Sequence, residues 1–295
     1  MKKLSSVVLA PAKINLALAV TAKRADGFHS LQTVFQSISL VDRVKVTIKN
    51  QGIACYCGDL SGEKNLAYKA AQVFLEQYKA MDLLKGPVGV EITIEKNIPL
   101  QAGLAGGSSN AAAVLRAMNI LFSSPFSYEK LLEIAKKCGS DTAFCLKGGT
   151  QWGEGTGTDL TELPSAPEMD ILLVKPSQGI STAFAYQIFD EVGEYSTLSK
   201  NLWADLLKAK EPKLIGRNLS NSLERAAICL LPEIARIKDL LLQGGCHGAL
   251  LSGSGSTVFG IVQDKKQGKE IAKLLSDQGF VNTWLVKTIN AQSTI

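Results

Sequence analysis

Residues 99–110 have the sequence Pro99-Leu100-Gln101-Ala102-Gly103-Leu104-Ala105-Gly106-Gly107-Ser108-Ser109-Asn110. They follow an alternating apolar run at 90–95, which predicts a half-buried strand, and precede an alanine-rich helical stretch at 111–121. Glycines let a backbone approach a ligand closely, and the first N–H groups of a helix lack intrahelical partners at the positive end of its dipole. A glycine-rich loop that enters a helix therefore predicts a phosphate site.

Two familiar phosphate loops do not fit this stretch. A P-loop needs Gly, four residues and then Gly-Lys-Ser/Thr, but no lysine follows Gly106 or Gly107. The dinucleotide fingerprint Gly-x-Gly-x-x-Gly opens the helix of a βαβ unit, whereas the order here is Gly-x-x-Gly-Gly, about ninety residues into the chain. A third kind of phosphate loop and a plain tight connection between strand and helix are the alternatives that stay open.

Composition and charge are those of an ordinary globular chain. Of 295 residues, 46% are hydrophobic and 20% are charged, and a chain of this length can bury a substantial core. The formal net charge of +5 comes without any basic tract, which fits an anionic substrate and argues against nucleic acid as a partner. No apolar run approaches the length of a membrane span, so we expect no membrane partner.

Cysteine and histidine usage gives little support to a metal site. The six cysteines match no zinc pattern, and several lie in apolar stretches, which predicts buried thiols in a reducing cytosol. The two histidines, His29 and His247, are too few for a histidine-rich site. The N-terminal apolar run loosely resembles a signal peptide, but Lys13 and Asn15 interrupt it. We therefore expect a cytoplasmic protein.

The hydrophobic pattern predicts a mixture of strands and helices. Strands are expected at 5–12, 14–22, 32–40, 44–49, 89–95, 171–174 and 280–287, with a strand–turn–strand pair over 248–261. Helices are expected at 65–79, 111–121, 128–137, 181–191, 198–209, 216–229, 231–243 and 266–278. Gly, Thr, Pro and Ser over 153–169 indicate a loop-rich boundary, and the absence of regular βαβ alternation favours an α+β fold over a doubly wound sheet.

Two charged residues have unusual surroundings. Lys13 lies inside an apolar strand, where a lysine either reaches water at an edge, pairs with a carboxylate or acts chemically. Asp141 follows the helix at 128–137, and it either caps the next helical turn or serves as a general base and partner of Lys13. A second glycine run, Ser252-Gly253-Ser254-Gly255-Ser256, is typical of a flexible hairpin turn.

Five segments, taken in order, resemble the GHMP kinases, the superfamily of galactokinase, homoserine kinase, mevalonate kinase and phosphomevalonate kinase. They are Pro11-Ala12-Lys13-Ile14-Asn15-Leu16, Arg24-Ala25-Asp26-Gly27-Phe28-His29, the loop at 103–110, Gly139-Ser140-Asp141 and Ser252-Gly253-Ser254-Gly255. The resemblance spans most of the chain. It implies an N-terminal domain over 1–165 like ribosomal protein S5 and a ferredoxin-like C-terminal domain over 166–295. It also implies an ATP-dependent small-molecule kinase, with ATP on the glycine loop and Mg²⁺ accompanying it through protein ligands that stay unassigned.

The same resemblance implies a role for each matching residue. Lys13 and Asp141 are expected to be catalytic, facing the transferred phosphate and the acceptor hydroxyl. Asn15, Phe28, His29 and Asp141 are expected to contact the acceptor. The segment that ends in Phe28-His29 indicates a cytidine-diphosphate-linked methylerythritol, because relatives with other substrates lack it. The expected ATP-binding residues are Asn65, Pro99, Gln101, Ala102, Gly103, Leu104, Ala105, Gly106, Gly107, Ser108 and Ser109.

Three positions depart from the family pattern. Phe28 replaces a usual Tyr, so it can stack on a cytosine ring without the hydroxyl's hydrogen bond; Leu251 replaces Met, and Thr142-Ala143 replaces a Pro-containing segment. Two rival interpretations stay open, a kinase of another alcohol such as homoserine or mevalonate and an S5-like RNA-binding protein. We expect a monomer or a weak homodimer.

Overall fold

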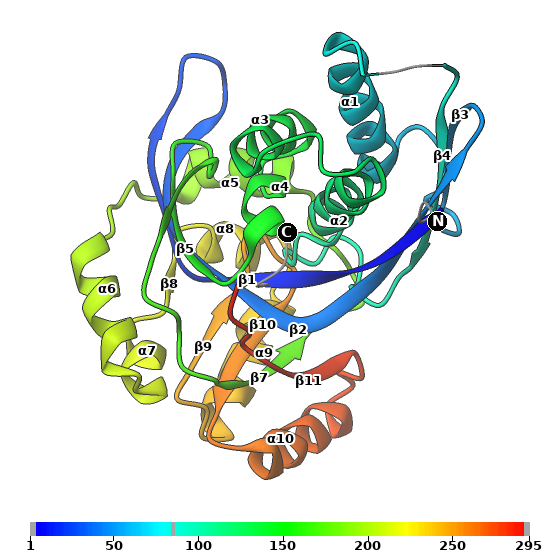
Figure 1. Ribbon diagram of the computed structural model, residues 1–295. Helices are drawn as coiled ribbons and strands as arrows, with labels where there is room; N and C mark the ends of the chain where they lie inside the picture. Colours follow the sequence, from blue (N-terminus) through cyan, green and yellow to red (C-terminus); the bar gives the residue numbers. More distant parts are fainter. Residues whose placement is uncertain (1–3, 84–85, 292–295) are drawn as a thin grey trace.

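The computed structural model describes residues 4–83 and 86–291 (Figure 1). Its longest feature is an antiparallel pair formed by β1 (Ser5–Lys23) and β2 (His29–Lys49). The sequence predicts four shorter strands here, at 5–12, 14–22, 32–40 and 44–49. The structure joins them into two, because the register shifts between Pro11 and Lys13, between Asn15 and Ala17 and between Val20 and Ala22 are accommodated within the paired strands and do not end them.

In the described part of the chain, this pair is the centre of a seven-stranded sheet with the order β3-β4-β2-β1-β8. β5 pairs with β2 and β6 pairs with β5. The remaining strands are β3 (Gly52–Tyr56), β4 (Gly89–Glu95), β5 (Thr150–Glu154), β6 (Asp159–Glu162) and β8 (Ser220–Asn221). Of these the sequence predicts β4 alone. The other four are short. β6 lies inside the stretch 153–169 that is predicted to be loop-rich and β5 overlaps its start, so local patterning does not reveal them.

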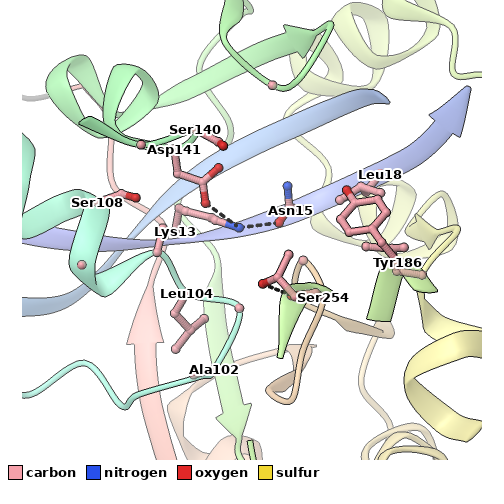
Figure 2. Close-up of a pocket in the computed structure, with 18 of the residues that line it drawn as sticks. Lys13, Asn15, Leu18, Ala102, Leu104, Ser108, Ser140, Asp141, Tyr186 and Ser254 are labelled. Atoms are coloured by element: carbon pink, nitrogen blue, oxygen red, sulfur yellow. Dashed lines mark hydrogen bonds and ion pairs between the residues drawn. The ribbon is translucent and has the colours of Figure 1, made fainter. Parts of the chain in front are cut away.

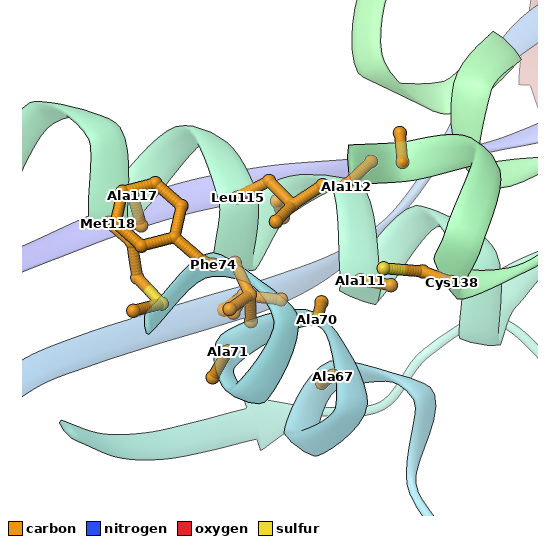
Figure 3. Close-up of a cluster of buried hydrophobic side chains, with 14 of the residues drawn as sticks. Ala67, Ala70, Ala71, Phe74, Ala111, Ala112, Leu115, Ala117, Met118 and Cys138 are labelled. Atoms are coloured by element: carbon orange, nitrogen blue, oxygen red, sulfur yellow. The ribbon is translucent and has the colours of Figure 1, made fainter. Parts of the chain in front are cut away.

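Four helices pack together over one face of this sheet (Figure 1). They are α1 (Leu66–Ala80), α2 (Gly106–Leu121), α3 (Tyr128–Cys138) and α4 (Thr142–Lys147). Figure 3 shows why α1 and α2 come so close, since alanines of both helices face each other around the fully buried Phe74. Truncating such a buried phenylalanine to alanine typically costs about 3–5 kcal/mol of stability.

Helix α2 begins at Gly106, five residues before the predicted start at 111. Glycine and serine have low helix propensity, so sequence reasoning leaves them in the loop. Burial overrides that preference, because Ser109, Asn110 and nearly every residue after them in α2 are buried. The helix therefore presents its glycines as its first turn.

The second sheet has the order β11-β7-β10-β9, and all its neighbours are antiparallel. Its strands are β7 (Asp170–Val174), β9 (Gly248–Leu251), β10 (Val258–Val262) and β11 (Thr283–Lys287). Numbered in chain order, these strands lie 4-1-3-2, with helices between the first and second and between the third and fourth. This is the ferredoxin-like arrangement that was expected, and the α+β class is confirmed.

The helices of this half are α5 (Thr182–Val192), α6 (Lys200–Ala209), α7 (Pro212–Arg217), α8 (Glu224–Leu230), α9 (Glu233–Gln243) and α10 (Lys265–Asp277). The single helix predicted at 216–229 is wrong, because α7 and α8 are separated by β8. Asn221 explains the break, since its Nδ2 donates to the carbonyls of Leu251 and Gly253, and its Oδ1 accepts the Leu223 N–H.

A shared core joins the two sheets. Trp152 of the first sheet, Phe259 of the second and Trp203 of α6 belong to one buried cluster. The Thr288 N–H donates to the Met169 carbonyl, and Ile38 forms a bridge with Thr288. Among the described residues, none of the helices combines the length and the apolar character that a membrane crossing requires.

Candidate active site

A cavity of about 860 Å³ gathers residues from both halves of the chain. Its walls come from β1, the glycine loop, the start of α4, α5 and the second glycine run (Figure 2). Most of the residues predicted from the sequence line it: Lys13, Asn15, Phe28, His29, Pro99, Gln101, Ala102, Gly103, Leu104, Ala105, Gly106, Gly107, Ser108 and Asp141. A volume of this size is typical of a ligand site.

Lys13 is the buried cation of this cavity, with 4% of its surface exposed. Its Nζ donates to Asn15 Oδ1 at 2.8 Å and lies 3.6 Å from Asp141 Oδ2 (Figure 2). Asn15 Nδ2 in turn donates to the Thr33 hydroxyl at 2.8 Å, and that hydroxyl donates to the Ala17 carbonyl at 2.6 Å. Lys13 and Asn15 share a face because they lie two residues apart on a strand. The series of hydrogen bonds fixes the position of the ammonium group.

Asp141 directly precedes α4, but its carboxylate does not cap that helix. Its side chain is 29% exposed and points toward Lys13 in Figure 2. Of the alternatives that the sequence leaves open, the geometry therefore favours a partner of Lys13 over a cap. A carboxylate beside an ammonium group in a cavity can accept a proton from a bound hydroxyl.

The start of α2 is open to an anion. The residue before it, Ala105, has a left-handed backbone with φ 56° and provides no side-chain cap. The N–H groups of Gly106, Gly107 and Ser108 therefore have neither a cap nor a preceding helical turn, while Ser109 N–H makes the first bond to the Ala105 carbonyl at 2.9 Å. These N–H groups, at the positive end of the helix dipole, are suited to phosphate.

The second glycine run, at 252–256, forms the turn predicted from its sequence. It also hydrogen-bonds to the glycine loop at 99–110. Ser252 Oγ donates to the Gly103 carbonyl at 3.0 Å, and the N–H of Ser256 donates to the Gln101 carbonyl at 3.3 Å. Gly103 has φ +71°, and a Cβ there would lie 1.9 Å from the Ser252 carbonyl oxygen. Gly253 also lies close to Lys13, since its Cβ would be 3.2 Å from Nζ. The two loops thus form a single wall.

A buried ion pair missed by the sequence reasoning supports the glycine loop. Asp42 is fully buried, and its Oδ1 accepts the N–H groups of Asn97 at 2.7 Å and Ile98 at 2.8 Å. Its Oδ2 accepts from Asn110 Nδ2 at 2.8 Å and pairs with Lys96 Nζ. Lys96 also lines the cavity beside Gly106. The position of Lys96, directly after β4 and before the glycine loop, is the sequence signal that could have identified it.

Aromatic residues collect at another part of the cavity. Phe28 is 65% exposed and lines the cavity, so it is not a core residue. The His29 ring stacks on Tyr186 with centroids 4.8 Å apart, and His29 Nε2 lies 2.7 Å from Asp190 Oδ1. Burial raises the pKa of Tyr186 to about 12, so its hydroxyl stays protonated. Tyr186 and Asp190 come from α5, and no local pattern in the sequence marks them.

Two predicted nucleotide residues lie outside the cavity lining. Asn65 caps α1, since its Oδ1 accepts the Ala67 N–H at 2.9 Å and its Nδ2 donates to the Leu60 carbonyl at 2.9 Å. Ser109 is fully buried, and its hydroxyl donates to the Pro11 carbonyl at 2.7 Å. Their contacts in the structure are thus within the fold, and their nucleotide roles stay predictions.

Comparison with known proteins agrees with this fold and site. A model of the GHMP kinases N terminal domain matches residues 65–149, and a model of the GHMP kinases C terminal matches residues 203–279. A 4-diphosphocytidyl-2-C-methyl-D-erythritol kinase of Desulfitobacterium hafniense (strain Y51) is 48% identical over 283 residues, which cover 96% of this chain and 95% of the relative.

Solved structures give the same result. A 4-(cytidine 5'-diphospho)-2C-methyl-D-erythritol kinase matches with a TM-score of 0.81 at 32% identity, covering 96% of this chain and 99% of that one. A homoserine kinase from Cytophaga hutchinsonii ATCC 33406 matches with a TM-score of 0.75 at 21% identity, covering 99% of this chain and 96% of that one, which shows the fold alone.

Fold and site together define a small-molecule kinase of the GHMP class. Within that class, the chain belongs to the 4-diphosphocytidyl-2-C-methyl-D-erythritol kinase family. The resemblance first seen in five short segments is thereby confirmed. Neither rival interpretation, a homoserine or mevalonate kinase or an S5-like RNA-binding protein, has comparable support.

Proposed function

We propose that this chain transfers the γ-phosphoryl group of ATP to the 2-hydroxyl of 4-diphosphocytidyl-2-C-methyl-D-erythritol, a step of non-mevalonate isoprenoid precursor biosynthesis. One observation carries the proposal. The Lys13–Asp141 pair lies in a cavity that also holds an uncapped glycine-rich helix start and the aromatic residues around His29. The names of the relatives supply the identity of the acceptor.

The glycine loop would hold the phosphates of ATP. The N–H groups of Gly106, Gly107 and Ser108 would donate to phosphate oxygens, and Lys96 would add positive charge beside them. Phosphoryl transfer leaves the protein little covalent chemistry, so positioning and charge stabilisation account for most of the catalysis. The glycine loop supplies the positioning, because Ser252 and Ser256 hold it to the second glycine run.

Lys13 and Asp141 would act at the reacting atoms. The 2-oxygen of the acceptor forms a bond to the γ-phosphorus as the bond from that phosphorus to the β,γ-bridging oxygen breaks, and ADP leaves. Asp141 accepts the proton of the 2-hydroxyl. Lys13, whose Nζ lies 3.6 Å from that carboxylate, neutralises charge on the transferring group.

Mg²⁺ would enter with the nucleotide. In the described part of the chain, His, Cys, Asp and Glu side chains form no group of three or more that could hold a metal ion. This fits an ion held largely by phosphates, as Mg²⁺ commonly is in kinases, and Ser108 and Asp141, which line the cavity, would hold it from the protein side. When bound, the ion would supply charge neutralisation at the phosphate oxygens.

The aromatic part of the cavity would hold the cytosine. Phe28 and Tyr186 offer ring faces for stacking, and His29 offers a ring nitrogen to the edge of the base. Asn15, which binds Lys13, would contact the acceptor between the base and the reacting hydroxyl. The exposure of Phe28 supports this role, because an aromatic side chain open to a cavity is available to a ligand.

Further parts of the proposal concern the whole chain. The two domains would be residues 1–165 and 166–295, a boundary supported by the connection between β6 and β7. The enzyme would work in the cytoplasm as a monomer or a weak homodimer. Its six free cysteines support a reducing compartment.

A substrate panel tests the proposed function. ADP release from ATP and Mg²⁺ is measured with 4-diphosphocytidyl-2-C-methyl-D-erythritol, homoserine, mevalonate and methylerythritol 4-phosphate as acceptors. We expect the cytidine-diphosphate-linked alcohol to give the highest kcat/KM by several orders of magnitude. Equal or faster turnover of an acceptor that lacks the cytidine diphosphate would contradict the proposal.

A further inference from the structure

His29 is held by a carboxylate that is itself held by a lysine. The His29 side chain is 5% exposed, with its ring stacked on Tyr186 and edge-on to Phe189. Its Nε2 lies 2.7 Å from Asp190 Oδ1, while Asp190 Oδ2 accepts from Lys23 Nζ at 2.6 Å. β1, β2 and α5 thus each supply one member of a Lys23–Asp190–His29 series.

This series determines where the imidazole proton lies. The hydrogen bond from Lys23 lowers the pKa of Asp190, so Asp190 is a carboxylate at neutral pH and can only accept. The contact at 2.7 Å therefore requires a hydrogen on His29 Nε2. Among residues 4–83 and 86–291, no hydrogen-bond partner occupies Nδ1. In the neutral ring, Nδ1 then carries a lone pair and accepts a hydrogen bond.

We infer that Asp190 is a specificity-determining residue that makes the site prefer cytosine over uracil by fixing His29 as a hydrogen-bond acceptor. The inference rests on the proposed function and names the feature of the base that is recognised. Cytosine carries the N4 amino group, a donor, at the position where uracil carries the O4 carbonyl, an acceptor. An accepting Nδ1 matches the amino group and opposes the carbonyl. Asp190 thus acts through His29, as a positioning residue.

The protonation state of His29 in the wild-type protein is the first test. The chain has two histidines, so long-range ¹H–¹⁵N spectra of the imidazoles contain two ring systems, and a His247→Gln variant identifies the one that belongs to His29. We expect the Nε2–H tautomer at pH 7.5, before and after addition of CDP as the probe. A hydrogen on Nδ1, in the other tautomer or in the imidazolium, would overturn the inference without any change in fold.

Base discrimination is the second test. In Asp190→Asn the amide can donate to Nε2 and leave the hydrogen on Nδ1, which suits uracil. We expect the ratio of kcat/KM for the cytidine substrate to that for its uridine analogue to fall about ten- to a hundredfold, chiefly through the cytidine KM, with the ATP KM unchanged. Glu191→Gln is the matched control, because Glu191 is exposed and next to Asp190 on α5. It should keep the wild-type ratio.

The outcomes separate this inference from the proposed function. A wild-type enzyme that does not phosphorylate the cytidine substrate contradicts the proposed function. A wild-type enzyme that does so, while folded Asp190→Asn keeps the wild-type ratio, contradicts the role of Asp190 alone. A merely structural Asp190 would lower stability and leave the base ratio unchanged.

Discussion

At the scale of single residues, Lys13 shows how a buried strand can include a cation while the neighbouring side chains stay in the hydrophobic core. Its neighbours Ala12 and Ile14 are fully buried, while its ammonium group is turned to the cavity and held by Asn15. A lysine flanked by apolar residues is recognisable in the sequence, and so is an aspartate after Gly-Ser. Their approach to 3.6 Å is not, because it depends on how α4 packs against β1.

Replacing Lys13 by methionine should reduce kcat much more than it weakens ATP binding. The side chain keeps its length and loses the charge aimed at the transferring group, a kind of loss that typically costs about 10²–10³ in kcat. Steady-state kinetics and ATP titration measure the two effects. Lys45→Met, a change at an exposed lysine of β2, is the control and should leave both near wild type. Loss of fold with full activity per folded molecule would mean that Lys13 is structural.

Asp141→Asn should leave the fold and ATP affinity intact and slow turnover. The amide keeps the shape of the carboxylate but cannot take the hydroxyl proton, and a general base typically contributes about 10²–10⁴. We expect the lower end of that range, since a loose phosphoryl-transfer transition state needs little base assistance. A kcat near that of the wild type in a folded variant would remove Asp141 from the mechanism.

Phe28→Ala should raise the KM for the cytidine substrate about ten- to a hundredfold, since stacking on an aromatic ring contributes about 1–3 kcal/mol per base. The ATP KM and the melting temperature should barely change, because the side chain is 65% exposed. Phe184→Ala is the matched control, at another exposed phenylalanine, with 60% exposure, that is not part of the cavity wall. Phe28→Tyr should be mild. A large loss of stability with both KM values unchanged would contradict stacking.

At the scale of elements, the glycine loop works because a second loop holds it in place. Sequence reasoning locates both loops, since glycine clusters beside apolar runs are local signals. It cannot show that Ser252 and Ser256 hydrogen-bond to the first loop, or that Asp42 fastens the loop to β4 and α2. These contacts join residues far apart in the chain. The ends of elements are hard to predict for a related reason. Tertiary packing extends α2 back to Gly106, although glycine has a low helix propensity.

Gly103→Ala should weaken ATP binding and lower stability together. A Cβ there would lie 1.9 Å from the Ser252 carbonyl oxygen, so the two loops would have to separate. Gly58→Ala is the control for backbone strain, because Gly58 also has a positive φ, +53°, but its Cβ would meet nothing within 4 Å. Calorimetric titration with ATP and thermal melting measure both effects. Unchanged ATP affinity in Gly103→Ala would show that the loop is only a connection.

At the scale of the whole molecule, the site exists because two sheets share a core. The sequence predicts the α+β class and the general order of elements from hydrophobic periodicity, and the five segments indicate the family. The Lys23–Asp190–His29 series could not be predicted, because α5 meets β1 and β2 only in the folded chain. The ion pair between Lys96 and Asp42 could not be predicted either, because it joins residues far apart in the chain, although each residue stands at the end of an apolar run.

The most direct test of the central claim is to follow the transferred phosphate by ³¹P NMR. The protein is incubated with ATP, Mg²⁺ and 4-diphosphocytidyl-2-C-methyl-D-erythritol, with Asp141→Asn as the matched sample. The account predicts a new phosphomonoester resonance that grows in step with ADP, while the diphosphate resonances of the acceptor persist, and much slower growth in the variant. ADP accompanied by inorganic phosphate instead of a monoester, or no monoester above the protein-free control, would contradict it.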